Sequence, residues 1–340
     1  MVLLNKGRVH IKGNSMTPID GLLAGILALS ALGITASASA QQSYPARPVR
    51  FVVPFAPGGG TDFVARLVAE KLGERIGQPL VVDNRAGAGG VIGSALVATA
   101  NPDGYTMLLG MVSPLAISPV LEKVSYDPVR DFSAASLLAS SYHVLVVHPS
   151  LPAKSVKDLI ALAKARSGQI NYASAGLGTN LFLISELFKS ATGTDIVHIP
   201  YKGTSPAVTA ILTGESHMMF GGITGVMGHT SSNRLRAIAV TSPTRSPLLP
   251  EVPTMVESGL SGIDVASWYA LVGPAKTPRA FLDRLSREIA KLYGQADYRQ
   301  QLERQAFEPL STSPDEFAAF MQRELDKWGK VVKASGVKSN

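Results

Sequence analysis

The sequence has 340 residues, a formal net charge of +7 at pH 7 and no cysteine. Without cysteine the chain can form neither a disulfide nor a thiolate metal site, and we expect no lipid anchor attached through a cysteine. The basic residues are interspersed with acidic ones and form no basic block interleaved with aromatic residues, so we expect no nucleic-acid partner. The length is sufficient for two domains of ordinary size.

Residues 1–40 have the pattern of a secretory signal peptide. Three basic residues precede the apolar run 21–34, and the small-residue sequence ASA at 38–40 is typical of a cleavage site. The apolar run is shorter than a comfortable membrane span. Met16 is an alternative start, and we expect export from either start. The mature protein is therefore predicted to be soluble in the periplasm after cleavage of the signal.

The first structured stretch is predicted to be a strand, a glycine loop and a helix in succession. Residues 49–55 form a short apolar run typical of a buried strand, and the three glycines at 58–60 interrupt regular structure. Apolar residues then recur at helical spacing as far as Gly77, which is expected to end the helix. We expect Thr61 or Asp62 to cap its first turn. The N-terminus of such a helix presents free N–H groups and a partial positive charge, which favours an anion.

Further along the chain, strand and helix patterns alternate, which predicts an α/β fold with mostly parallel sheets. Strands are expected over 79–83, 105–109, 142–148, 170–173, 197–201, 216–220, 235–240 and 268–272. Helices are expected over 91–99, 155–168, from 180 through 188, after 203, over 278–293 and over 313–333, with a loop opening at 113–114.

Three of these helices have a residue that we expect to cap the first turn. Ser155 with Asp158, and Ser313 with Glu316, have the spacing of capping boxes. Thr277 is expected to cap the helix that begins at 278. The outer faces of the two C-terminal helices are charged, so we interpret both helices as structural.

The loop DNRAGAGG at 83–90 is similar to a dinucleotide-binding fingerprint but lacks an essential part of it. A fingerprint that begins with Gly87 and Gly89 needs a third glycine where this chain has Ile92. The nearest later acid, Asp103, lies in a turn and not at a strand end. The first glycine loop likewise lacks the Gly-Lys-Ser/Thr ending of a phosphate loop. We therefore expect no nucleotide cofactor.

No motif for catalysis is found. The G-x-S-x-G and H-E-x-x-H patterns are absent, and the histidines show no ligand spacing, so we expect no metal and no cofactor. His198 and His217 lie in strand-like runs and are interpreted as satisfied core or rim residues. Asp62 is explained by a cap without a catalytic role. Lys202 has two open interpretations, a partner for an anion or a solvated loop residue. What remains is three glycine- or hydroxyl-rich loops, each leading into a helix, at the sheet edge where α/β proteins bind ligands.

The order of these segments resembles the Bug-type periplasmic receptors of tripartite tricarboxylate transporters. The resemblance runs from about residue 44 to the C-terminal helices. Its motifs are Tyr44-Pro45, VVPFAPGGGTD, DNRAGAGG, NPDGYT, SLPAKSVKDLI, NYASAGLGT, IPYKGTSPA, RLRAIAVTSPTRSPLLPEVPTMVESGL and Trp268-Tyr269. The resemblance implies a two-domain periplasmic binding protein fold of type II. Residues 41–142 plus 268–340 would then form domain 1 and residues 143–267 domain 2, with the ligand in the cleft between them.

The resemblance also implies which loops hold the ligand. The predicted ligand-binding residues are Phe55, Ala56, Gly59, Gly60, Thr61, Asp62, Ser174, Ala175, Gly178, Thr179, Asn180, Tyr201, Gly203, Thr204, Ser205, Pro206, Ala207 and Gly221. Two of them depart from the family pattern. Many relatives have histidine where this chain has Asn180, and many have aspartate where it has Gly221. Since both are expected to line or border the cleft, the ligand of a relative is not transferable.

The leading hypothesis is a receptor, not an enzyme, that captures a small organic carboxylate for transient delivery to membrane transporter subunits, working as a monomer. The alternatives are an orphan periplasmic sensor or co-receptor, and an exported hydrolase. Residues 55–61 and 174–180 contain no lysine or arginine. The carboxylate is therefore predicted to be held by backbone N–H groups and hydroxyls and not by a positive side chain.

Overall fold

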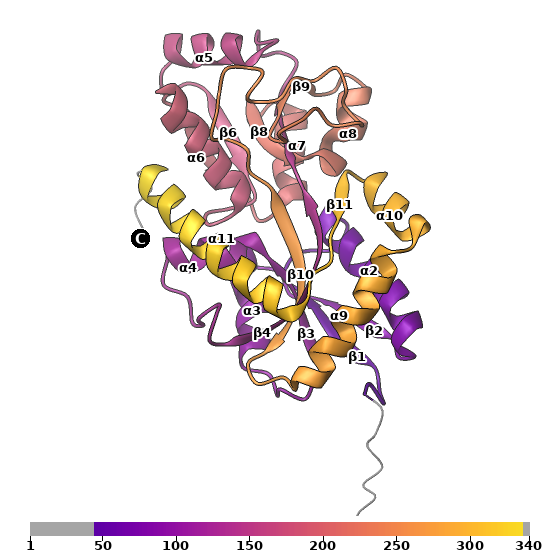
Figure 1. Ribbon diagram of the computed structural model, residues 1–340. Helices are drawn as coiled ribbons and strands as arrows, with labels where there is room; N and C mark the ends of the chain where they lie inside the picture. Colours follow the sequence, from indigo (N-terminus) through magenta and orange to yellow (C-terminus); the bar gives the residue numbers. More distant parts are fainter. Residues whose placement is uncertain (1–43, 336–340) are drawn as a thin grey trace, which may run out of the picture. The chain divides into compact units, whose positions relative to one another are not determined.

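The computed structural model describes residues 44–335, so the predicted signal peptide lies outside the described part of the chain. The described residues form two β-sheets (Figure 1). In spatial order, the first consists of β11 (Phe307–Pro309), β4 (Phe132–Ser141), β10 (Ser267–Pro274), β3 (Thr106–Met111), β1 (Val49–Val53) and β2 (Leu80–Asn84). The second consists of β7 (Val197–Pro200), β6 (Asn171–Ser174), β8 (Met218–Gly222), β5 (His143–Val147) and β9 (Arg236–Val240).

Most strands of each sheet run in one direction, as predicted. In the first sheet β1, β2 and β3 pair in parallel and β4 shares their direction, whereas β10 and β11 run against them. In the second sheet β5 alone opposes the others. The chain passes from the first sheet to the second between β4 and β5 and returns through β10. The strands that carry these crossings therefore make the antiparallel pairs.

Helices separate most of the strands. They are α2 (Gly60–Ile76), α3 (Val91–Ala98), α4 (Ser118–Leu121), α5 (Val156–Ala165), α6 (Asn180–Thr192), α7 (Thr204–Thr213), α8 (Ile223–Ser231), α9 (Arg279–Tyr293), α10 (Ala296–Glu303) and α11 (Pro314–Ser335). A 3₁₀ turn (Ala88–Gly90) precedes α3. A π-helical segment (Ser113–Ile117) precedes α4, so the prediction of a loop at 113–114 is wrong. A proline is tolerated in the first turn of a helix because its missing N–H group is not needed there.

The predicted caps have different outcomes. The Ser155 hydroxyl accepts a hydrogen bond from the Asp158 N–H at 3.1 Å, as a helix cap does. At the start of α11, Ser313 and Glu316 form the predicted reciprocal capping box. The prediction for Thr277 is wrong, because its hydroxyl donates to the Pro274 carbonyl at 2.7 Å and leaves the start of α9 without a side-chain cap.

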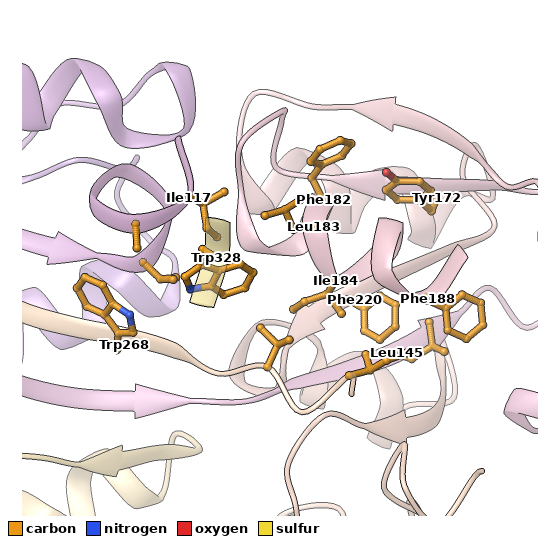
Figure 2. Packing of buried hydrophobic residues seen from close by; sticks show 14 of the residues in the cluster. Ile117, Leu145, Tyr172, Phe182, Leu183, Ile184, Phe188, Phe220, Trp268 and Trp328 are labelled. Carbon is orange, nitrogen blue, oxygen red and sulfur yellow. The ribbon is translucent and has the colours of Figure 1, made fainter. Parts of the chain in front are cut away.

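One apolar cluster spans both sheets, each sheet has a further cluster of its own, and α11 joins the two sheets. This helix packs against β4 and α4 beside the first sheet and against α6 beside the second. Its fully buried Trp328 lies in the common cluster, next to Ile117 in Figure 2. The indole N–H groups of Trp268 and Trp328 both donate to Glu324 at 2.9 Å, so the buried carboxylate is paired. Truncating a buried tryptophan typically costs about 3–5 kcal/mol, which makes this contact a major link in the unit that begins at residue 44.

Candidate functional site

The predicted binding loops lie where strands of one direction end and helices begin. The strands β6, β7 and β8 share a direction, so their carboxyl ends lie at one edge of the second sheet. At this edge the chain enters α6, α7 and α8. In the first sheet α2 likewise follows the carboxyl end of β1. The start of α8 was not predicted, because the glycines in and before this helix weaken the helical spacing of its apolar residues.

Asp62 does not cap α2, so that prediction is corrected. The cap residue is Gly59, which has no side-chain oxygen to offer, and Asp62 lies inside the first turn and is buried. Its carboxylate accepts hydrogen bonds from the Gly58 N–H at 3.1 Å, the Arg66 guanidinium at 2.8 Å and the Asn84 amide at 3.1 Å. Burial by itself would raise the pKa of this carboxyl, but the three hydrogen bonds outweigh burial and hold the pKa below the usual range. Asp62 therefore ties the glycine loop to the end of β2.

The start of α2 keeps its N–H groups available. In the part of the chain that the structure describes, no hydrogen bond uses the N–H of Gly59, Gly60 or Thr61. Asn84 also donates to the Phe55 carbonyl at 2.9 Å, which fixes the loop from its other side. Unpaired N–H groups in the first turn of a 17-residue helix are the donors that an anion needs.

The loop between β6 and α6 is held by its own hydroxyl groups. Thr179 caps α6 by accepting from the Phe182 N–H at 3.4 Å, and its hydroxyl donates to the Gly176 carbonyl at 2.7 Å. The Ser174 hydroxyl accepts from the Gly176 N–H at 3.1 Å. Gly178 has φ of +71°, a left-handed conformation that glycine adopts at little cost. The hydroxyls of Ser174 and Thr179, which were predicted to bind the ligand, thus support the loop itself.

Asn180 is buried, and its side chain is bonded to both strands that connect the sheets. Its amide contacts the Nε2 atom of His143 at 3.0 Å and donates to the Ser267 hydroxyl. Its backbone N–H donates at 3.2 Å to the hydroxyl of Ser113, which begins the π-helical segment after β3 of the first sheet. A ligand contact by Asn180 stays a prediction, but its amide nitrogen already has two partners.

Gly221 has no room for a side chain unless its surroundings move. It is buried near the end of β8, and a Cβ atom built on it would lie 2.9 Å from a methyl group of Val226. An aspartate here would therefore require Val226 to move. A ligand contact by Gly221 stays a prediction.

The third loop leads into α7 and has mixed exposure. Tyr201 donates its hydroxyl to Glu215 at 2.9 Å, and Lys202 is exposed. The cap residue of α7, Gly203, has no side-chain bond, and no hydrogen bond among the described residues uses the N–H groups of Thr204 or Ser205. This helix start is thus a second group of available donors.

The predicted site residues differ widely in accessibility. Exposed members are Ala56, Ser205 and Pro206. Partly exposed members are Phe55, Gly59, Gly60, Thr61, Tyr201, Gly203 and Thr204. Buried members are Asp62, Ser174, Ala175, Gly178, Thr179, Asn180, Ala207 and Gly221. The exposed and partly exposed members of the predicted set thus belong to the first and third loops.

Loops of the two sheets approach one another, through residues that were not predicted. A Cβ atom built on Gly89, in the turn after β2, would lie 3.3 Å from the Leu177 carbonyl in the loop after β6. The Thr224 hydroxyl in α8 donates to the Gln305 carbonyl just before β11. Of these residues, Gly89 lies in the DNRAGAGG motif and Leu177 in NYASAGLGT, whereas no motif contains Thr224 or Gln305.

A cavity of about 670 Å³ lies elsewhere, at the opposite edge of the second sheet. Residues at the start of α5, the end of α8 and in β9 line it together with 248–253, and none of the predicted site residues does. In residues 44–333 no three His, Asp or Glu side chains are grouped as a metal site. Over the same residues, no helix has the length and apolar character to cross a membrane.

Comparisons with known proteins agree with this architecture. Residues 64–337 match the family model of the tripartite tricarboxylate transporter family receptor. Protein BugT of Bordetella pertussis is 38% identical over 312 residues, covering 91% of this chain and 95% of that protein. The solved structure of R. palustris Rpa4515 with adipate is 35% identical, with a TM-score of 0.83, and covers 86% of this chain and 98% of its own.

MatC from Rhodopseudomonas palustris, solved with bound malate, is 30% identical and has a TM-score of 0.80, covering 85% of this chain and 100% of its own. The solved structure of periplasmic binding protein BugD is 33% identical and has a TM-score of 0.82, covering 87% of this chain and 100% of its own. The resemblance and the type II fold predicted from the motifs are therefore confirmed. Because the family model matches most of the sequence, this chain belongs to the tripartite tricarboxylate transporter receptor family.

Proposed function

We propose that this protein is a periplasmic receptor that holds a small organic carboxylate between the loops of its two sheets and delivers it to membrane subunits of a tripartite tricarboxylate-type transporter. The observation that carries the proposal is the unpaired N–H groups at the starts of α2 and α7. Relatives solved with adipate and malate suggest the chemical class of the ligand. The two domains are taken as residues 41–142 with 268–340, and 143–267, with export by a cleaved signal and a monomeric mature chain.

These donors are sufficient for useful affinity. A helix N-terminus stabilises an anion by about 0.3–1 kcal/mol, and by up to ~2 kcal/mol when the site is partly buried. Hydrogen bonds to a charged group contribute roughly 1.5–3 kcal/mol each. Two helix starts with two or three such bonds reach the roughly −8 kcal/mol of micromolar binding after ordering costs. No lysine or arginine is required.

We further propose that the ligand is bound without turnover. The nearest approach to a catalytic pair is Ser174 with His198, whose Oγ and Nε2 atoms are 2.7 Å apart. Ser174 is fully buried, and its hydroxyl already accepts from the Gly176 N–H. Within the described residues no carboxylate hydrogen-bonds to the His198 ring to orient it as a base. This arrangement suits a structural hydroxyl and not a nucleophile.

The test begins with the native ligand. Mass spectrometry of the protein purified from the periplasm should find an organic acid, and calorimetry with that acid should give about micromolar affinity, while its amide should bind far more weakly. Recovery of a chemically altered ligand after incubation would instead revive the hydrolase alternative. Intact mass should also place the mature N-terminus at Gln41.

Two cap variants separate the binding loop from general stability. Thr179→Ala removes the cap of α6 at the predicted site, and Ser155→Ala removes the equivalent cap of α5 at the opposite edge. Each should destabilise the protein by roughly 0.5–2 kcal/mol, but Thr179→Ala alone should weaken binding. Lys202→Ala should leave affinity nearly unchanged. If Lys202→Ala loses most of the affinity while Thr179→Ala keeps it, an ordinary ion pair holds the ligand and the proposal is wrong.

A further inference from the structure

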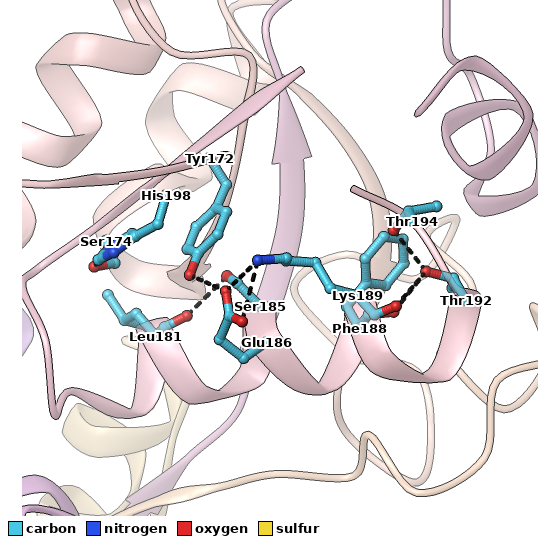
Figure 3. A network of polar contacts seen from close by, with 10 residues as sticks. All are labelled: Tyr172, Ser174, Leu181, Ser185, Glu186, Phe188, Lys189, Thr192, Thr194 and His198. Carbon is cyan, nitrogen blue, oxygen red and sulfur yellow. Dashed lines mark hydrogen bonds and ion pairs between the residues drawn. The ribbon is translucent and has the colours of Figure 1, made fainter. Parts of the chain in front are cut away.

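A buried serine and a partly exposed histidine form a hydrogen-bonded pair next to the loop that follows β6. Ser174, the last residue of β6, is fully buried, and its Oγ atom lies 2.7 Å from the Nε2 atom of His198 on the neighbouring strand β7 (Figure 3). The same oxygen accepts the Gly176 N–H at 3.1 Å and lies 3.3 Å from the Gly176 carbonyl. One hydroxyl thus joins the strand edge to the backbone of the loop.

The His198 ring is fixed between two aromatic side chains. It stacks on Tyr172 with centroids 4.8 Å apart and an interplanar angle of 22°, and it contacts Phe182 at the same centroid distance. Tyr172 is held in turn, because its hydroxyl donates to Glu186 at 2.6 Å and Glu186 pairs with Lys189 at 2.8 Å. Figure 3 shows this chain of contacts running from the loop to the middle of α6.

The ring is neutral at physiological pH. Burial lowers the pKa of His198 to about 4; the charge of Glu186 acts in the opposite direction and that of Lys189 in the same direction. In a neutral ring, either the serine hydroxyl donates to Nε2 or Nε2–H donates to the hydroxyl. In both arrangements the oxygen keeps a lone pair for the Gly176 N–H.

This support matters because the loop adopts a conformation that needs to be held. Gly176 has φ of +119°, outside the range of most residues. The next two N–H groups, those of Leu177 and Gly178, take part in no hydrogen bond in the described part of the chain. Two consecutive unpaired N–H groups in a turn just before the cap residue of a helix are donors for a carboxylate.

We infer that His198 is a positioning residue for ligand binding. Through the Ser174 hydroxyl it fixes Gly176, and it thereby keeps the loop in the shape that leaves the N–H groups of Leu177 and Gly178 available. His198 itself need not touch the ligand. The inference rests on the proposed function, because it assigns those N–H groups to a carboxylate.

Three variants separate the effect of the Nε2 hydrogen bond of His198 from the effect of packing its ring. His198→Phe keeps a stacked ring and removes Nε2, whereas His198→Gln places an amide nitrogen or oxygen near the Nε2 position. Ser174→Ala removes the partner. His217→Phe is the matched control, because His217 is also a partly exposed histidine of the second sheet but bonds to Asn171 and to no predicted loop.

Binding is measured by calorimetry with malate, adipate and a panel of related four- to six-carbon dicarboxylates. His198→Phe and Ser174→Ala should each weaken binding about tenfold, and the double variant should be no weaker than either single one. His198→Gln and His217→Phe should remain within about threefold of the wild type. Unchanged affinity in His198→Phe, or multiplied losses in the double variant, would overturn the inference.

Hydrogen exchange on the ligand-free protein supplies a readout that does not depend on the ligand. Exchange of the Gly176 N–H should be about tenfold faster in His198→Phe and should return to the wild-type rate in His198→Gln. Equal rates in all three proteins would refute the positioning role. If the rates change as expected but the wild type binds no acid in the panel, the positioning role stands and the proposed carboxylate function fails.

Discussion

Mild acid should destabilise this protein because His143 is buried in its neutral form. The Nδ1 atom lies 3.3 Å from the Val265 carbonyl, which can only accept, so Nδ1 carries the proton. Nε2 is then an acceptor for the Asn180 amide at 3.0 Å and the Ser267 hydroxyl at 3.2 Å. If Nε2 gains a proton, its N–H faces the N–H of the Asn180 amide, and the hydrogen bond between them is lost. This repulsion lies where β5 and β10 meet α6.

The magnitude follows from the pKa of this imidazole. Burial lowers the pKa of His143 from 6.5 to about 4, although the hydrogen bond to Val265 opposes the change. The unfolded chain therefore binds a proton at a higher pH than the folded protein, so stability falls as the pH drops below 6.5. At pH 5 the unfolded residue is mostly charged and the folded one mostly neutral, which corresponds to a loss of about 2 kcal/mol relative to pH 8. The loss levels off below about pH 4.

Urea unfolding at about pH 8 and pH 5 measures this effect, with His143→Gln as the variant that cannot titrate. Other groups titrate in both proteins, so the informative quantity is the difference between their two pH dependences. The wild type should lose about 2 kcal/mol more than the variant. Equal losses in the two proteins would mean that protonated His143 is accommodated and that the assigned tautomer is wrong.

Two further predictions concern the loops. Asp62→Ala should lower the free energy of unfolding by about 2–4 kcal/mol in urea titrations. This is more than the loss of a cap, because three groups lose their charge-assisted hydrogen bonds to the carboxylate. A loss under about 1 kcal/mol would favour the cap interpretation. Gly221→Ala should cost roughly 1–3 kcal/mol through its contact with Val226. Gly228→Ala, in open space on α8, should be neutral or stabilising by about 0.5–1 kcal/mol. Equal thermal shifts in both variants would contradict this packing argument.

The long periodic elements of the fold were predictable, and the elements that depend on distant partners were not. The glycine that ends α2 adopts the expected left-handed conformation, and the capping box of α11 forms as its spacing predicts. By contrast, β4 was missed because FSAASLLASS consists largely of serine and alanine and lacks a β-branched run. It is a strand because it pairs with β10 on one side and β11 on the other. The α8 helix, with two internal glycines, forms where Ile223 and Val226 are buried.

At the candidate site, the sequence predicted the loops but not the roles of their polar side chains. The position of Asp62 beside a helix start indicated a cap, yet its carboxylate bonds to Asn84 at the end of strand β2. Asn180 follows a small-residue loop and was assigned to the ligand, yet its partners His143 and Ser267 are 37 and 87 residues away. Local spacing contains no information about such partners. Only the packed structure reveals that these groups are already paired.

The distribution of polar groups suggests how the receptor obtains selectivity without a charged anchor. Asp62 and Ser174 are buried and each accepts a hydrogen bond from a loop N–H, and the buried Asn180 amide bonds to the His143 and Ser267 side chains. The N–H groups of Gly59, Gly60 and Thr61 before and in α2, and of Thr204 and Ser205 in α7, have no partner among the described residues. Since backbone N–H groups are alike, the distances between the loops decide which acid fits. Substitutions among the buried polar residues should therefore change ligand preference more than substitutions of exposed charges such as Lys202.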